Sequence, residues 1–169
     1  MARDTTCDSN LTPFGDNRPP CYNCDEKASC YAIASYHKLF AKPGSTMLLT
    51  SDAPGDTIDA MKQEIHESGP ISCGIMATHK MEHSYSGGIY SEEPPDTDSR
   101  INHVVGVVGW GIDGNKNEYW HVRNSWGGEW GEDGFMKIVT STNPGPLGTG
   151  NNLLEEECAF TTPDRYAYS

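Results

Sequence analysis

The sequence predicts an α+β fold, with a strongly bent antiparallel sheet, short helices and a disulfide-stapled N-terminal segment. Three observations lead to this prediction. Strand-like segments dominate the second half of the chain, a single strong helical pattern precedes them, and four of the six cysteines lie within residues 7–30. The expected strands lie near residues 71–77, 101–110, 118–124 and 134–140, with turn sequences such as Asp113-Gly114 between them.

The strongest helical pattern runs from Asp56 to Ser68. Ile58, Met61 and Ile65 recur at the spacing of one helix face, so this face is expected to pack on the core. Asp56 is a candidate N-cap, and the Gly69-Pro70 pair that follows is a stop signal.

A second, short helix is predicted from Ala28 to Phe40, because Ile33, Tyr36 and Phe40 lie at near-helical spacing. The remaining segments are rich in Pro, Gly and polar residues, which favours loops. These are residues 1–20, 43–55, 92–99 and 143–150, after which Leu153 and Leu154 are expected to return to the core.

Length, composition and charge limit the number of domains and the kinds of partner. The 169 residues fit one domain of ordinary size, and 36% hydrophobic residues suffice for a modest core. A net charge of −12 argues against nucleic acid or an anionic membrane surface as a partner, and it suits an acidic compartment. No apolar run approaches the roughly 20 residues that span a bilayer.

The cysteines favour an oxidising environment, lysosomal or secreted, and the sequon Asn10-Leu11-Thr12 agrees with a glycoprotein. A zinc site is the competing interpretation, with Cys21, Cys24, Cys30 and His37 as ligands. The long gap after Cys24 and the lack of a second C-x-x-C pair disfavour zinc. No metal and no cofactor is expected.

Two residues in the second half carry candidate chemistry. His103 lies in an apolar run, and Asn124 opens a segment with Trp126, Trp130 and several glycines. Alone, each residue is ordinary, since a lone His in a strand is usually a core residue and an Asn-Ser pair usually forms a turn. Together they suit nucleophilic catalysis, in which an imidazole activates a thiol and a third group orients the imidazole.

The segments 101–111 and 124–135 resemble the His and Asn segments of papain-like cysteine peptidases. Residues 64–77 and 86–90 extend the resemblance. The sequence of these segments is similar to that of the cathepsin X (cathepsin Z) group of lysosomal carboxypeptidases. This resemblance implies that residues 56–169 form the barrel-like right-hand domain, which carries His103 as base and Asn124 as its orienter. Residues 1–55 would form a cysteine-rich loop and short-helix segment.

The resemblance also implies binding residues and disulfides. Asn102 and Trp126, with Trp130 beside them, would border the leaving-group side. Gly74 and Val104 would line the pocket for the residue one before the scissile position. By the same resemblance Cys24 would bond to Cys30, and Cys73 to Cys158, whereas the partners of Cys7 and Cys21 would belong to the absent half of the enzyme.

No nucleophile stands in the expected place. The family motif C-G-[SA]-C-[WY] lies about 130–150 residues before the His, whereas Cys30, in a superficially similar segment, precedes His103 by only 73. We therefore expect a truncated chain that is inactive alone, with a peptide or protein substrate and the missing N-terminal half of the enzyme as partners. By the same resemblance, the right-hand domain would form one wall of the substrate cleft. Exposed in this chain, that wall would favour self-association. The alternative is a non-catalytic module that binds peptides or a partner through that wall.

Overall fold

The computed structural model describes residues 22–24, 30–32, 37–49, 54–93 and 99–168, with side chains for 40–49, 57–93 and 99–164. The chain forms two compact units, Met1–Lys42 with Pro163–Ser169, and Pro43–Thr162. This division falls at residue 42, earlier than the domain boundary expected at residue 55, and it places the C-terminal residues with the first unit.

The described part of the first unit consists of paired strands. β1 (Tyr22–Cys24) pairs with β2 (Cys30–Ala32), and β3 (His37–Ala41) pairs with β11 (Pro163–Tyr168), both antiparallel. The helix predicted over residues 28–40 is therefore wrong at its described positions. The partner of β3 comes from the opposite end of the chain, and tertiary pairing of this kind overrides a weak local pattern.

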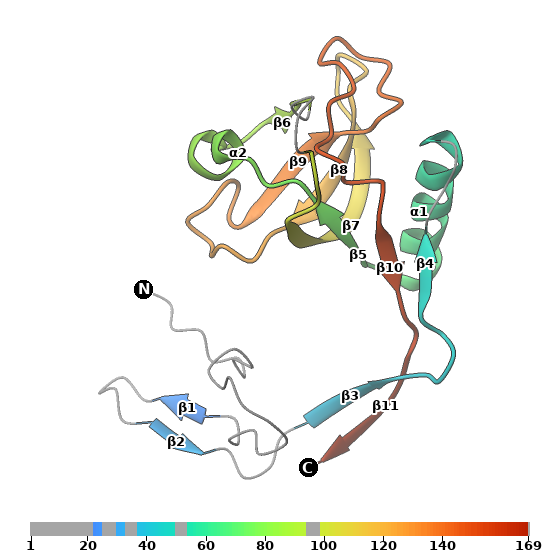
Figure 1. Ribbon diagram of the computed structural model, residues 1–169, viewed down its shortest axis with the longest axis vertical. Coiled ribbons are helices and arrows are strands. Elements are labelled where there is room, and N and C mark those ends of the chain that lie inside the picture. Colours follow the sequence, from blue (N-terminus) through green and yellow to red (C-terminus); the bar gives the residue numbers. More distant parts are fainter. Residues whose placement is uncertain (1–21, 25–29, 33–36, 50–53, 94–98, 169) are drawn as a thin grey trace. The chain divides into compact units, whose positions relative to one another are not determined.

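The second unit contains a seven-stranded sheet in the order β4-β10-β5-β7-β8-β9-β6. Its pairs are antiparallel except for β6 with β9. The strands are β4 (Met47–Leu49), β5 (Ile71–Ile75), β6 (Ile89–Tyr90), β7 (His103–Ile112), β8 (Glu118–Arg123), β9 (Phe135–Val139) and β10 (Cys158–Phe160). The four strands expected from the sequence are confirmed as β5, β7, β8 and β9, and so is the α+β fold class. Figure 1 shows α1 beside β4 and β10, and α2 beside β6, at the other end of the sheet.

Helix α1 (Pro54–Ser68) confirms the strongest helical pattern and starts two residues earlier than expected. Asp56 is therefore not the N-cap but lies in the first turn; Pro54 takes the first position, where a missing N–H costs nothing. Ile58, Met61 and Ile65 are buried, as expected of the apolar face. The helix ends at Gly69, whose φ of +101° suits glycine.

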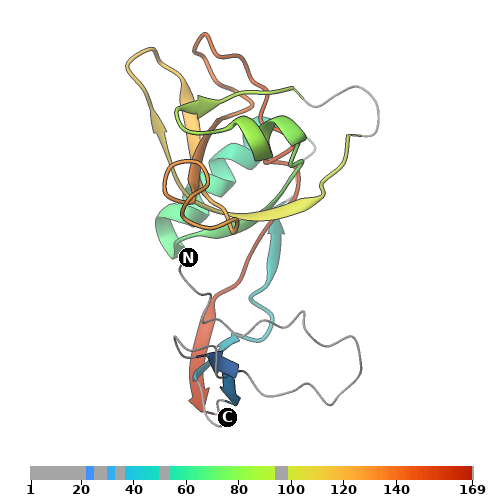
Figure 2. The same ribbon diagram turned by 90° about the vertical axis from the view of Figure 1, so that its left-hand side faces the viewer.

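Helix α2 (His79–Ser84) was not expected from the sequence. The Thr78 side chain caps it by accepting a hydrogen bond from the Met81 backbone N–H, and Met81 is its one buried residue. A single apolar anchor in six residues leaves no periodic pattern to detect. Figure 2 views the sheet from the side of α2, with α1 behind it.

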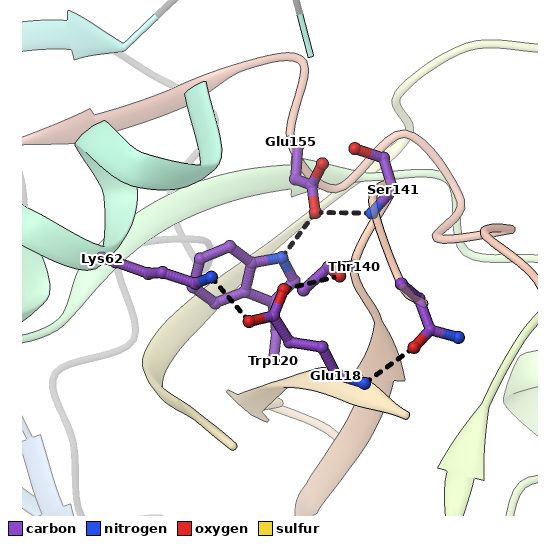
Figure 3. Close-up of polar contacts among 7 residues, drawn as sticks. Lys62, Glu118, Trp120, Thr140, Ser141 and Glu155 are labelled. Carbon is purple, nitrogen blue, oxygen red and sulfur yellow. Dashed lines mark hydrogen bonds and ion pairs between the residues drawn. The ribbon is translucent and has the colours of Figure 1, made fainter. Parts of the chain in front are cut away.

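A row of buried and half-buried polar contacts ties α1, β8 and the 140–155 segment together (Figure 3). Lys62 Nζ of α1 lies 2.7 Å from Glu118 Oε1 of β8. The indole Nε1 of Trp120, which is fully buried, donates to Glu155 Oε1 at 2.6 Å, and the Ser141 backbone N–H donates to the same oxygen at 3.1 Å. Both hydrogen bonds fall on Oε1 of this buried carboxylate, whereas its Oε2 is buried without a hydrogen-bond partner among the described residues.

The disulfide between Cys73 and Cys158 is present and joins β5 to β10, confirming that pairing. Cys24 and Cys30 lie opposite each other in β1 and β2, but their side chains are outside the described set, as are Cys7, Cys21 and the sequon at Asn10. No helix in the described ranges is long and apolar enough to cross a membrane.

Candidate active site

The site is built where β7 begins and β8 ends. His103 is the first residue of β7, and Asn124 directly follows β8, its antiparallel neighbour. His103 Nε2 lies 2.9 Å from Asn124 Oδ1. Because an amide oxygen only accepts, Nε2 carries the hydrogen, and in the neutral ring Nδ1 then holds the free lone pair. Among the described residues, none is hydrogen-bonded to Nδ1.

The orientation of Asn124 is itself fixed. Its side chain is 8% exposed, and its Oδ1 also accepts the Ser125 backbone N–H at 2.8 Å. Its own backbone N–H donates to Gly134 O at 2.9 Å. The Ser125 N–H requires an acceptor, which identifies the atom facing His103 as oxygen. Asn124 is thus held ready to orient the imidazole.

Trp126 covers His103, and Trp130 supports Trp126. The ring of Trp126 stacks on that of His103 with centroids 4.9 Å apart and planes at 19°, and Trp130 meets Trp126 edge-on at 4.9 Å and 88°. Trp130 Nε1 donates to the Glu82 carbonyl of α2 at 3.1 Å. An apolar cover of this kind strengthens the hydrogen bond beneath it by excluding water.

The loop that carries the tryptophans is anchored by a residue that the sequence analysis missed. Glu132 accepts hydrogen bonds from Lys137 Nζ at 2.7 Å and from the Gly88 N–H at 3.1 Å. The Lys137 hydrogen bond is the main reason that the pKa of Glu132 lies below its usual value. Gly131 completes the turn with a φ of +61°, and a Cβ there would lie 2.5 Å from the Phe135 carbonyl oxygen.

Asn102 has a structural contact that was not foreseen. Its side-chain Oδ1 accepts the Ala77 N–H at 2.8 Å, and its Nδ2 donates to the Ala77 carbonyl at 3.0 Å. Both ends of the amide are therefore used to fasten the residue before His103 to the segment between β5 and α2. The expected contact of Asn102 with substrate stays a prediction.

Gly74 and Val104, the expected pocket residues, are direct partners across β5 and β7. Gly74 is buried, and a Cβ there would lie 2.7 Å from Ile101 Cγ2, whereas Val104 is 61% exposed. Only Val104 reaches the shallow pocket beside Asn124, which is also lined by Pro70, Ser72, Gly106, Arg123 and Ser125. Their roles in binding stay predictions.

The described residues include no free thiol near Nδ1. Cys73 and Cys158 are bonded to each other, and the side chain of Cys30 is outside the described set. Within the described ranges, no group of three or more His, Cys, Asp or Glu side chains is arranged to hold a metal ion. The arrangement supplies an oriented imidazole, which can accept a proton from a nucleophile brought to Nδ1.

An oriented His–Asn pair on a bent antiparallel sheet is the arrangement that the resemblance to papain-like cysteine peptidases led us to expect. Comparison with known proteins agrees, because the model of the papain family of cysteine proteases matches residues 7–162. The chain belongs to this family.

Similar relatives include a cathepsin Z of Onchocerca volvulus, 37% identical over 96% of this chain and 47% of its own length. A cathepsin L of Sarcophaga peregrina is 38% identical over 64% of this chain and 32% of its own length. The chain thus spans about half the length, or less, of the curated relatives it matches.

Solved structures agree on the fold. Digestive procathepsin L 3 of Tenebrio molitor larval midgut superimposes with a TM-score of 0.54 at 29% identity, over 69% of this chain and 34% of that one. Bromelain of Ananas comosus gives a TM-score of 0.53 at 23% identity, over 71% and 50% of the two chains, and supports the fold alone.

Proposed function

We propose that this chain supplies the imidazole and amide of a papain-family active site, with His103 as base and Asn124 as its orienter. The observation that carries the proposal is the 2.9 Å contact from His103 Nε2 to Asn124 Oδ1, which leaves Nδ1 for a thiol. A thiol facing that nitrogen loses its proton to it, and the resulting thiolate is the nucleophile.

The thiol is proposed to come from a separate segment that carries a C-G-[SA]-C-[WY] motif, which this sequence lacks. The chain would then be inactive on its own, because loss of a nucleophile costs several orders of magnitude in rate. His103 would transfer the thiol proton to the leaving amine as the acyl-enzyme forms, and water would then release the product.

The proposed reaction is removal of C-terminal amino acids from peptides or proteins. The supporting observation is the similarity to a cathepsin Z over 96% of the chain. We further propose a lysosomal or secreted location and a glycosylated chain, in keeping with the Cys73–Cys158 disulfide. Asn102, Trp126, Gly74 and Val104 are proposed to contact the peptide.

The test is complementation. The pure chain would be assayed alone, and after co-refolding with the nucleophile-bearing segment of a papain-family relative. Two peptides would be compared, one with a free C-terminal carboxylate and one with a C-terminal amide. We expect activity only in the mixture, only on the free carboxylate, and none with His103→Ala.

A segment whose motif Cys is replaced by Ala is the matched control and is expected to give no activity. Hydrolysis by the chain alone that is abolished by Cys30→Ala would overturn the proposed source of the thiol. Peptide binding by the mixture without any hydrolysis would favour the non-catalytic module instead.

A further inference from the structure

Helix α2 carries two histidines that the proposed active site does not use. His79 and His83 are four residues apart, so their side chains lie on one face of the helix, one turn from each other. Their rings stack, with centroids 4.1 Å apart and planes at 16°. Both residues are exposed, so this face is open to solvent.

The hydrogen bonding of His83 fixes which of its nitrogens is available. His83 Nδ1 lies 3.1 Å from the backbone carbonyl oxygen of His79. A carbonyl oxygen only accepts, so Nδ1 carries the hydrogen and Nε2 holds the lone pair in the neutral ring. An imidazole whose Nδ1–H is held by a carbonyl is the usual form of a histidine that binds a metal through Nε2.

The charges around the pair favour a cation. Glu82 Oε2 lies 3.8 Å from His83 Nδ1, and the whole chain carries a net charge of −12. Lys80, the neighbouring cation, is turned away, with its Nζ 5.6 Å from the centroid of the Tyr90 ring. No cation of the described residues is paired with either imidazole.

We propose that His79 and His83 form a two-imidazole site for a divalent transition-metal ion of the Zn²⁺ or Cu²⁺ class. Imidazole nitrogens suit these ions, and two histidines at this helical spacing bring both Nε2 atoms to one ion once the exposed His79 ring turns out of the parallel stack, in which the two lone pairs point the same way. Water fills the remaining coordination positions, since the described residues bring no third His, Cys, Asp or Glu into such a group. The site is separate from His103, and the proposal does not rest on the proposed peptidase activity.

The site lies on the helix that supports the cover of the candidate active site. Glu82, between the two histidines, accepts the Trp130 indole N–H through its carbonyl, and Trp130 packs on Trp126. A metal ion that joins both ends of this short helix restrains the segment on which Trp130 rests.

The test is calorimetric titration of the full chain with ZnCl₂ at pH 7.5, in a buffer that does not bind metal, with the disulfides intact and any free thiol first blocked with N-ethylmaleimide, because a free thiolate would itself bind Zn²⁺. The variants are His79→Ala and His83→Ala. The matched control is His66→Ala, an exposed histidine of α1 without a histidine partner one turn away. We expect one saturable site in the wild type and in the control.

Each test variant is expected to bind at least about tenfold more weakly, because even a residue that only supports a ligand affects metal affinity to that extent. Equal affinity of His83→Ala and the wild type would overturn the proposal, as would a wild type without saturable binding. NMR of the wild type checks the result without mutation: the ring protons of His79 and His83 must shift together on Zn²⁺ addition, while those of His66 stay in place.

Discussion

His103 and Asn124 are 21 residues apart in sequence, yet His103 Nε2 lies 2.9 Å from Asn124 Oδ1. The pairing of β7 with β8 produces this contact, since one residue opens the first strand and the other directly follows the second. The contact therefore depends on the pairing of these two strands.

Asn124→Ala removes the acceptor of two donors, His103 Nε2–H and the Ser125 N–H. We expect a loss of about 1–3 kcal/mol in unfolding free energy, the cost of leaving buried groups unpaired. We also expect the Nε2 proton resonance of His103 to disappear, because that proton would exchange freely with water. Denaturant unfolding and NMR measure the two effects. Asn115→Ala, at an exposed turn, is the control. An unchanged Nε2 proton resonance in Asn124→Ala would contradict the hydrogen bond from His103 to Asn124.

The Glu155 carboxylate tests the buried network of Figure 3. Glu155→Leu leaves the Trp120 N–H and the Ser141 N–H without an acceptor, at a cost of about 1–3 kcal/mol each. Glu155→Gln keeps an acceptor oxygen for both donors, so it should cost much less. Thermal unfolding of the two variants decides this, and equal losses would show that the hydrogen bonds of Glu155 are unimportant.

The contact between Glu132 and Lys137 predicts a pH dependence. The pKa of Glu132 is lowered in the folded chain, first by the hydrogen bond from Lys137 and then by that from Gly88. Its ionised form therefore stabilises the fold above its unfolded-state pKa, and this contribution is lost as the pH falls through the lower folded value. Glu132→Gln should be less stable than the wild type at pH 7, by at most about 1 kcal/mol because the pair is partly exposed.

This stability difference should shrink as the pH falls from 7 towards 3 and the wild-type carboxyl takes up its proton. Urea unfolding at both pH values measures it. Lys137→Met is the reciprocal control and should show the same narrowing, whereas a gap that is independent of pH would refute the role of the pair.

The Cys73–Cys158 disulfide links residues 85 apart in sequence. Closing a loop of this length contributes about 4–5 kcal/mol in the chain-entropy model. The double variant Cys73→Ala/Cys158→Ala should lose a substantial part of this stabilisation. It should still fold, because β5 and β10 remain partners in the sheet without the bond. Guanidinium unfolding checks the loss. No loss in the variant would mean that the unfolded chain is already constrained.

Self-association is expected through the wall that contains the candidate site. Val104 is 61% exposed there. Trp126 and Trp130 pack on each other, so each is only partly exposed. Val104→Ser should weaken a concentration-dependent dimer in sedimentation equilibrium. Leu147→Ser, at an exposed position on the 143–150 loop, is the control. A wild type that is monomeric at all concentrations would refute this expectation.

The sequence by itself determined the elements whose signal is local and repeated. Ile58, Met61 and Ile65 define α1 because three residues at helical spacing form one buried face. Strand β7 was also predictable, because its long apolar run favours a strand. His103 and Asn124 were identified because the Trp- and Gly-rich segment beside Asn124 is rare enough to specify their setting.

Only the tertiary structure decided the rest, because the deciding partners are distant in sequence. β3 is a strand because β11 pairs with it, and Asn102 holds Ala77 because β7 places the two segments side by side. Helix α2 was missed although its Thr78 cap is local, because its one buried residue, Met81, gains its burial from the surrounding fold. Such contacts depend on long-range packing, whose free energy exceeds local propensity and leaves no periodic trace in the chain.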